Sequence, residues 1–187
     1  AYCLNHIDIS NQDLIVDCGA NVGELNLALS YKNIDVNYKA FEPDEMTFKC
    51  LVLNNNENPE NEFFNLGLSN LNGSTTFYLD NEGGNSSLVN FGSNQTTEIE
   101  TKTLDSFKFE NIKVLKIDAE GFEPEVLEGS VNTLKGTEFV SIDFGAERGL
   151  EQNKTIIEVN DLLYENNFRL VKFSDFRFIG LYKNINF

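Results

Sequence analysis

The sequence predicts an α/β protein whose core is a doubly wound, mostly parallel sheet with helices on both faces. Short runs rich in Val, Ile and Phe alternate with segments of helical period, which is the pattern of strands joined by crossover helices. The last two aromatic-rich runs have no helix between them, so we expect them to pair antiparallel. The 187 residues are 41% hydrophobic, which is enough for one well-buried core, and we expect a single domain over residues 1–187.

The first expected strand covers residues 14–17, and residues 1–13 form a lead-in to it. In the helical segment that follows, Val22, Leu25 and Leu29 recur on one face, which should cover the sheet. Because the sequence opens at Ala1 rather than at a methionine, a truncation at this end is one interpretation of the lead-in.

A second strand is expected at 36–42, with a helix after Pro43. Met46, Cys50 and Leu53 recur at i, i+4 and i+7 of this helix, so we expect that face to pack inward. Cys50 should then be a small buried hydrophobic residue, as should Cys18 in the first strand.

Two short apolar runs, at 63–68 and 75–79, bracket the dipeptide Asn72-Gly73, a strong hairpin signal. They are expected to form a third strand and an added partner strand. The turn-rich segment 80–95, with NEGGNSS at its centre, is expected to be a mobile loop near the ligand. A plain surface excursion is the equal alternative.

The second half of the chain repeats the alternation of strands and helices. The expected elements are strands at 96–103, 112–118 and 139–144, a helix that carries Leu127, Val131 and Leu134 and ends at Gly136 as its cap, a helix that carries Ile156, Val159 and Leu163, and the final antiparallel pair at 170–173 and 178–182.

The charge of the chain argues against two classes of partner. Fourteen basic residues against thirty acidic ones give a net charge of −16, which opposes phosphate backbones and anionic lipid surfaces. We therefore expect no nucleic acid and no membrane partner, and no segment reaches the length of a membrane span. Three cysteines without CxxC spacing, and no leader-like start, favour a reducing, cytoplasmic location. Nothing in the sequence indicates the oligomeric state.

Acidic side chains end four of the expected strands. In a doubly wound sheet the ligand lies beyond the carboxyl ends of the strands, so a polar residue that ends an apolar run is a candidate for the site. A single such acid is more often a helix cap, but several in register favour a ligand site. The four acids are Asp17, Glu42, Asp118 and Asp143.

The spacing of the first two acids indicates a nucleoside without a diphosphate. Glu42 lies nineteen positions after Gly23, about the distance at which an acid accepts hydrogen bonds from ribose hydroxyls. The glycines of GANVG would let the backbone approach the ligand, but Asp17 would repel a diphosphate and Asn21 would crowd it. An acid suits an ammonium or sulfonium charge, and S-adenosylmethionine carries both with a ribose and no phosphate.

The chain also resembles a known family, the FkbM-type methyltransferases. Six blocks occur in the family's order and cover roughly residues 14–143, and KIDAEGFE is the most specific of them. The blocks are VDCGANVG, FEPDE at 41–45, NLGLSNLNG at 65–73, GNSSL at 84–88, TLDSF at 103–107 and LKIDAEGFEPEVLEGS at 115–130. One departure is Asp143, where this family more often has glutamate.

The resemblance implies a class I methyltransferase fold, Rossmann-like, with a seven-stranded sheet, an antiparallel last strand and an added hairpin. It implies S-adenosylmethionine as the methyl donor and O-methylation of a hydroxyl on a sugar or other small natural product. Carried onto this sequence, it implies a methionine-binding loop of Asp17, Gly19, Asn21 and Gly23, ribose binding by Glu42 beside Pro43, adenine contacts from Gly67 and Leu68, and Asp118 facing the methionine amino group or the transferring methyl.

A hydroxyl acceptor must lose its proton, and Asp118 and Glu120 are the candidate catalytic bases. Against this, Glu120 and Glu123 precede or open a helix, where carboxylates often serve only as caps. Metal ligation by Asp118, Glu120 and Asp143 is conceivable, but the pattern is weak and we predict no metal site. His6 is a minor alternative base.

Two other functional classes fit parts of this pattern. A domain that binds the nucleoside without transferring a methyl group would show cofactor affinity without turnover. A nucleotide-dependent oxidoreductase would bind NADH, but Asp17 and Asn21 argue against it. The leading hypothesis is an S-adenosylmethionine-dependent O-methyltransferase whose acceptor the sequence does not identify.

Overall fold

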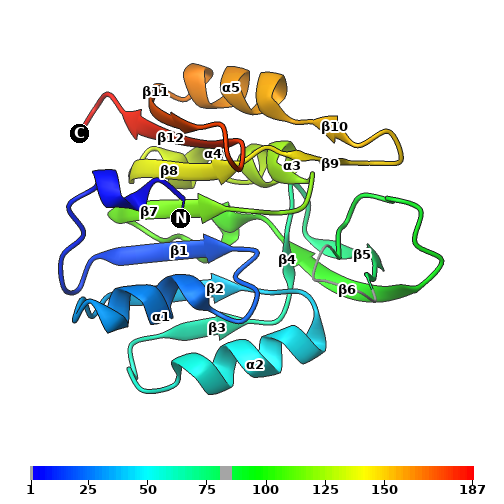
Figure 1. Cartoon of the computed structure of the whole chain (residues 1–187), viewed down its shortest axis with the longest axis horizontal. Coiled ribbons are helices and arrows are strands. Elements are labelled where there is room, and N and C mark those ends of the chain that lie inside the picture. Colours follow the sequence, from blue (N-terminus) through cyan, green and yellow to red (C-terminus); the bar gives the residue numbers. More distant parts are fainter. Residues whose placement is uncertain (1, 81–85) are drawn as a thin grey trace.

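A computed structural model describes residues 2–80 and 86–187 and shows the predicted α/β architecture (Figure 1). Seven strands form one sheet in the order β11-β12-β8-β7-β1-β2-β3, and β12 runs antiparallel to both of its neighbours while the other pairings are parallel. The doubly wound, mostly parallel sheet is therefore confirmed. Its strands are β1 Leu14–Cys18, β2 Asn37–Phe41, β3 Glu62–Phe64, β7 Ile112–Ile117, β8 Thr137–Asp143, β11 Phe168–Ser174 and β12 Ile179–Asn184.

Helices cover both faces of this sheet because successive strand residues point to opposite sides and both sides are apolar. On one side, Leu29 of α1 and Leu51 of α2 pack with Ile15. On the other side, Leu127 of α3 and Leu163 of α5 pack in the second cluster. The helices are η1 Leu4–His6, α1 Glu24–Tyr31, α2 Glu45–Asn55, η2 Leu104–Phe107, α3 Glu123–Glu128, α4 Val131–Leu134 and α5 Ile156–Glu165.

The order of the strands reverses beside β1. The chain runs outward from β1 through β2 to β3, and then returns to place β7 on the other side of β1. Crossover connections leave a crevice at such a switch point, beyond the carboxyl ends of the strands. The residues that follow β1, β2 and β7 are thereby brought to one edge of the sheet.

A second, three-stranded sheet lies beside this edge, and it corrects the expected hairpin at Asn72-Gly73. Its order is β4-β6-β5, so β6 lies between the two strands that were expected to pair with each other. The Asn72 side chain accepts the backbone N–H of Thr103, which follows β6, and so connects the turn to that strand. The hairpin that forms joins β5 to β6. The strands are β4 Gly67–Leu68, β5 Gly73–Tyr78 and β6 Thr96–Lys102.

The long β5–β6 connection is described only in part. Residues 81–85 of the predicted loop 80–95, and with them Gly84 and Asn85 of the GNSSL block, lie outside the described residues. Ser87 forms an antiparallel bridge with Tyr78, and its hydroxyl donates to the carbonyl of Glu120 at 2.7 Å. The end of this connection is therefore attached to the turn after β7.

The predicted inward face of α2 is wrong. Met46 and Leu53 are 67% and 72% exposed, and Cys50 is exposed as well. The buried side chains are instead Leu51 and Asn55, because the Asn55 amide donates to the carbonyls of Leu51 and Val22 and holds the helix against the start of α1. The prediction that Cys18 is buried is confirmed.

The helix expected to carry Leu127, Val131 and Leu134 is two short helices, α3 and α4. They are separated at Gly129, where a Cβ atom would lie 2.0 Å from the carbonyl oxygen of Ser69. This close approach of the β4–β5 connection leaves no room for a side chain. Gly136, the expected cap, does not adopt a left-handed conformation.

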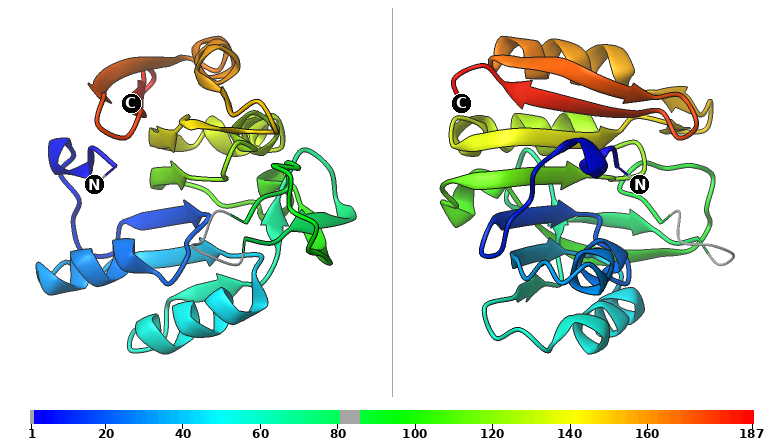
Figure 2. Two further views of the ribbon diagram at one scale, coloured as in Figure 1. Left: turned by 45° about the vertical axis from the view of Figure 1, so that its right-hand side comes forward. Right: turned by 60° about the vertical axis from the view of Figure 1, so that its left-hand side comes forward.

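The C-terminal half otherwise follows the expected order. The aromatic-rich runs form β11 and β12, which pair antiparallel as predicted. A small ribbon of β9 Ala146–Arg148 and β10 Asn153–Lys154 precedes α5. Seen from the side, α1 and η1 lie on one face of the main sheet and α3 lies on the other with the small sheet (Figure 2). Within the described ranges, every helix falls short of the length and apolarity that crossing a membrane requires.

Candidate functional site

A cavity of about 420 Å³ opens at the carboxyl ends of β1, β2 and β7, with the small sheet along one side. Its volume is in the range of small-molecule sites. The structure brings nine of the ten predicted cofactor and catalytic residues to this cavity, and Gly23 lies outside its lining. The nine are Asp17, Gly19, Asn21, Glu42, Pro43, Gly67, Leu68, Asp118 and Glu120.

Glu42 follows β2 and places a buried carboxylate in the cavity wall. One of its oxygens accepts the backbone N–H of Asn21 at 3.0 Å, and the other accepts the N–H of Asp44 at 2.9 Å. Burial raises the pKa of Glu42 from 4.5 to about 7, although these two N–H groups act in the opposite direction. Each oxygen keeps a lone pair, so the group can accept two further hydrogen bonds from a ligand.

The glycines after β1 serve the protein's own packing. Gly19 has φ 70°, and a Cβ atom there would lie 1.8 Å from the carbonyl oxygen of Asp118. Gly23 has φ 85°, and its Cβ would lie 2.0 Å from the Asn55 side chain. Both glycines allow the loop to turn left-handed against β7 and α2, and the expectation that they let the backbone approach the ligand stays a prediction.

Asp17 is almost fully buried, and its charge is compensated inside the protein. Its Oδ1 lies 2.9 Å from Nζ of Lys116 in β7, and its other oxygen accepts the hydroxyl of Tyr38. The expectation that Asp17 offers a free charge to a cationic ligand is corrected by this ion pair. Burial alone would lower the pKa of Lys116, but the carboxylates of Asp17 and Asp118 raise it above its ordinary value.

Asp118 follows β7 and faces the cavity from the opposite side to Glu42. Its Oδ2 accepts the phenol O–H of Tyr2 at 2.6 Å and lies 3.7 Å from the Arg177 guanidinium. Tyr2 is in turn held by Ser141, whose hydroxyl donates to the Tyr2 carbonyl at 2.6 Å. The site thus already presents Asp118 as an acceptor for a hydroxyl group.

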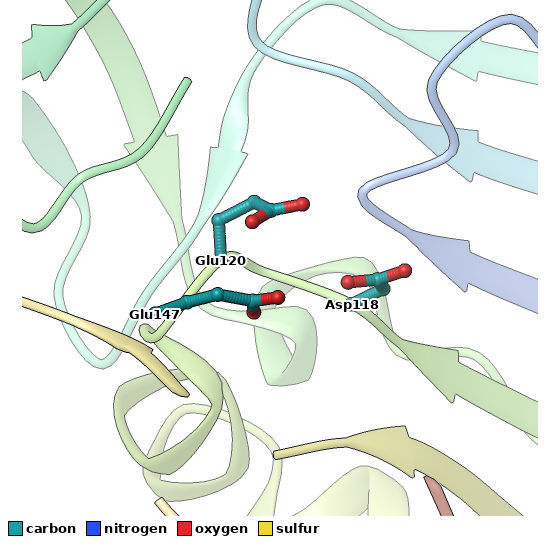
Figure 3. A group of neighbouring side chains, drawn as sticks. All are labelled: Asp118, Glu120 and Glu147. Atoms are coloured by element: carbon teal, nitrogen blue, oxygen red, sulfur yellow. The ribbon is translucent and has the colours of Figure 1, made fainter. Parts of the chain in front are cut away.

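Glu120 also lines the cavity, and its carboxyl group lies near those of Asp118 and of Glu147 in β9. Figure 3 shows it beside Asp118 and Glu147, and one oxygen from each of the three carboxyl groups lies within 4.8 Å of the others. Burial, and after it the carboxylates of Glu147 and Asp118, raise the pKa of Glu120 from 4.5 to about 9. Burial, then the charges of Asp143 and Asp118, raise that of Glu147 to about 7. Glu120 therefore carries a proton at neutral pH.

The oxygen-only group that the sequence suggested for a metal differs from the one in the structure. Glu147 takes the place expected for Asp143, which has another partner: it accepts the N–H of Gly145 at 2.9 Å. Carboxylate oxygens suit hard divalent cations, and among the residues that the structure describes, Asp118, Glu120 and Glu147 form the group that could hold such an ion. That the site works without a metal stays a prediction.

Glu123 is a structural group, as the cap interpretation expected. Its Oε1 accepts the N–H groups of Ala119 and Gly121, and its Oε2 accepts the hydroxyl of Thr155 at 2.9 Å. Gly121 has φ 91°, and its Cβ would lie 2.8 Å from the backbone of Arg148. The turn that carries Glu120 is therefore fixed by the Glu123 carboxylate and by the packing of Gly121 against Arg148.

The position of His6 argues against the alternative that it is the base. It lies exposed in η1 and does not line the cavity. Sequence reasoning also missed several residues that line the cavity, among them Tyr2, Lys116 and Arg177. Lys116 carried a detectable signal, because a charged residue inside an apolar strand needs a partner. Tyr2 and Arg177 carried none, since only the fold brings the two ends of the chain to Asp118.

Most of the chain is similar in sequence to known proteins. Residues 17–170 match the family model of the methyltransferase FkbM domain. Over 143 residues the chain is 30% identical to the hexuronic acid methyltransferase AglP of Haloferax volcanii, in an alignment that covers 74% of this chain and 59% of that protein. The chain thus spans about three fifths of that relative's length.

Solved structures share the fold. A methyltransferase FkbM from Methylobacillus flagellatus matches with a TM-score of 0.64 at 16% identity, over 96% of this chain and 45% of that one. Streptococcus pneumoniae Sp1610, a putative tRNA (m1A22) methyltransferase in complex with S-adenosyl-L-methionine, matches with a TM-score of 0.54 at 14% identity, over 94% and 68%. The exclusion of nucleic acid stays a prediction from the charge, because one such neighbour is named as a tRNA enzyme.

The raised pKa of Glu120 makes a prediction about stability. The unfolded chain loses this proton near pH 4.5 and the folded chain near pH 9, so the folded state holds more protons between these values and its stability falls as the pH rises through them. We expect Glu120→Gln to raise the thermal unfolding midpoint by about 2–4 °C at pH 8, and by less at pH 5. Calorimetry at both pH values measures this. The exposed Glu165→Gln is the control, and an unchanged midpoint for Glu120→Gln at pH 8 would contradict the prediction.

Proposed function

The chain belongs to the FkbM methyltransferase family, and from this premise we propose that it transfers a methyl group from S-adenosylmethionine to a hydroxyl of a carbohydrate or other small natural product. The observation that carries the proposal is the buried carboxylate of Glu42 in the wall of a cavity at the ends of β1, β2 and β7. Ribose hydroxyls need such an acceptor at the end of the second strand.

The residues of the cavity fit the cofactor along its length. Glu42 accepts hydrogen bonds from the ribose hydroxyls, with Pro43 beside it. Gly67 and Leu68 of β4 are buried and border the adenine. Asn21 contributes through its backbone, because its N–H holds the Glu42 carboxylate in position.

Charge supports a cationic cofactor over a phosphorylated one. Carboxyl groups of Glu24, Glu42, Asp44 and Asp118 line the cavity beside the protonated Glu120, and the cations that line it are Lys116, which is paired with Asp17, and Arg177. This wall attracts an ammonium or sulfonium group and repels a diphosphate. We assign Asp118 to the methionine amino group or the transferring methyl.

The likeness to a hexuronic acid methyltransferase supports a carbohydrate acceptor. A sugar offers hydroxyl donors, and Asp118 already accepts a hydroxyl from Tyr2 in this structure. We assign the acceptor to this side of the cavity, where Asp118 orients the hydroxyl through a hydrogen bond.

The cofactor supplies an electrophilic methyl group on a sulfonium centre. The acceptor oxygen forms a bond to this carbon as the carbon–sulfur bond breaks, and the electron pair of that bond stays on sulfur as a neutral thioether. Orientation by the cavity contributes much of the acceleration. The hydroxyl proton passes to a carboxylate that lines the cavity, and we assign this base to Glu120, two residues beyond Asp118.

The assignment of Glu42 predicts the affinity for the cofactor product. We expect Glu42→Ala to weaken the binding of S-adenosylhomocysteine by about 10- to 100-fold, because two hydrogen bonds to a charged acceptor are lost. Isothermal titration calorimetry measures this, with the exposed Glu45→Ala as control. Absence of binding to the unmodified chain would contradict the proposed function, and equal affinity in Glu42→Ala would contradict the ribose assignment.

The assignment of Glu120 predicts a pH profile. A base must be deprotonated, so we expect the rate of methyl transfer to rise with pH up to about 9, and Glu120→Gln to remove this rise. Asp118→Asn should lower the rate by about 100-fold at every pH. The measurement is transfer of labelled methyl to a panel of uronic acids and neutral sugars. An unchanged profile in Glu120→Gln would refute its role as the base.

A further inference from the structure

Lys116 is a lysine in the middle of the central sheet. It lies in β7 directly opposite Asp17 of β1, and its side chain is 3% exposed. Lysine is almost never fully buried unless it is paired, because removing an ammonium group from water costs several kcal/mol. The group lines the cavity, yet the proposed cofactor contacts do not use it.

The ammonium group of Lys116 directs its hydrogen bonds and its ion pair at β1 and the loop that follows it, and it also lies 4.9 Å from the centre of the Tyr2 ring. Its Nζ lies 2.9 Å from Oδ1 of Asp17, 2.6 Å from the carbonyl oxygen of Gly19 and 3.3 Å from that of Cys18. The two contacts with the carbonyl oxygens are hydrogen bonds, and the contact with Asp17 is an ion pair.

The loop needs such a partner because its first two peptide groups have the same orientation, with both carbonyl groups directed away from β2. The N–H groups of Gly19 and Ala20 both donate to the carbonyl of Phe41 in β2, at 3.1 and 3.0 Å. Their carbonyl sides, at Cys18 and Gly19, therefore point toward β7, where Lys116 receives them. Each peptide plane is held from both neighbouring strands.

The rest of the loop depends on this orientation. After Gly19 the chain passes through left-handed conformations at Asn21, with φ 49°, and Gly23, with φ 85°. A non-glycine residue in this region is strained and persists only where its surroundings hold it. The N–H of Asn21 reaches Glu42 from this conformation.

We propose that Lys116 is a positioning residue that holds the loop 18–23 in the conformation that receives the cofactor. Asp17 acts through Lys116: it keeps the ammonium group charged and aimed at the loop carbonyls, and it does not touch the ligand. This assignment rests on the proposed function, because it takes the cavity to be the cofactor site.

The chain offers a matched control in Lys39. This lysine lies in β2, is 7% exposed, and pairs with Glu62 at 2.6 Å and with the carbonyl of Glu60 at 2.8 Å. It has the same chemistry as Lys116, an ion pair and a carbonyl contact, but does not line the cavity. Loss of a buried lysine in general is thereby separated from loss of the loop contact.

The experiment compares Asp17→Asn/Lys116→Met, Asp17→Asn and Lys39→Met with the unmodified chain. The double variant leaves no unpaired buried charge, so it is the version most able to fold. Two quantities are measured at a temperature where all four are folded: amide hydrogen exchange of residues 19–23 without ligand, and the affinity for S-adenosylhomocysteine by calorimetry.

We expect the double variant to exchange the amides of 19–23 at least about tenfold faster and to bind S-adenosylhomocysteine at least about tenfold more weakly. Asp17→Asn should have smaller effects on both, because Lys116 keeps its two carbonyl contacts. Lys39→Met should stay within about twofold of the unmodified chain in both measurements.

The proposal would be overturned if the double variant had the same amide exchange rates and the same affinity for S-adenosylhomocysteine as the unmodified chain. It would also be overturned if Lys39→Met changed both quantities as much as the double variant does. Should the unmodified chain itself fail to bind S-adenosylhomocysteine, the proposed function would fall, and the exchange rates would still decide whether Lys116 holds the loop.

Discussion

The close approach of the ends of β1 and β7 is the constraint on which the site depends. The backbone N–H of Asp118 donates to the carbonyl of Cys18 at 3.1 Å, and Gly19 lies so near the Asp118 carbonyl that it has no room for a Cβ atom. This contact puts the loop after β1 and the turn after β7 side by side. Asp17 and Lys116 then meet across the same pair of strands, and Glu42 receives the far end of the loop.

The acidic groups at and beside the site lower the stability of the folded chain. Burial and mutual repulsion raise the pKa of Glu120 to about 9, of Glu147 to about 7 and of Asp143 to about 6. Such shifts lower the stability of the folded chain toward alkaline pH, and they are typical of sites that exchange protons. Of these three groups, Glu120 lines the cavity, and a cationic ligand bound there offsets part of the repulsion among them.

The sequence was sufficient for the parts of the site that lie within single motifs. Asp17, Glu42 and Asp118 each end an apolar run, and parallel topology brings such ends together. Their individual roles were harder to predict: Asp17 was expected to be a free charge, because its partner Lys116 is a hundred residues away and looks like an interruption of an apolar strand. Tyr2 and Arg177 reach Asp118 only through the packing of both chain ends.

Errors in the predicted fold have equally local causes. The apolar spacing of Met46 and Leu53 was real, but a buried Asn55 that binds the Val22 carbonyl decides which face of α2 turns inward. At Asn72-Gly73 the hairpin dipeptide does not pair its flanking strands: β6 lies between them, and the Asn72 side chain accepts the N–H of Thr103, which follows β6. In α2, a polar side chain that bonds across the fold overrode apolar periodicity.

A crystal structure of the chain with S-adenosylhomocysteine tests the central claim most directly. The account predicts that the ribose hydroxyls lie within about 3.2 Å of the Glu42 carboxylate, that the adenine lies against Gly67 and Leu68, and that Asp17 keeps its contact with Lys116. A nucleoside bound elsewhere, or one whose ribose does not contact Glu42, would contradict it.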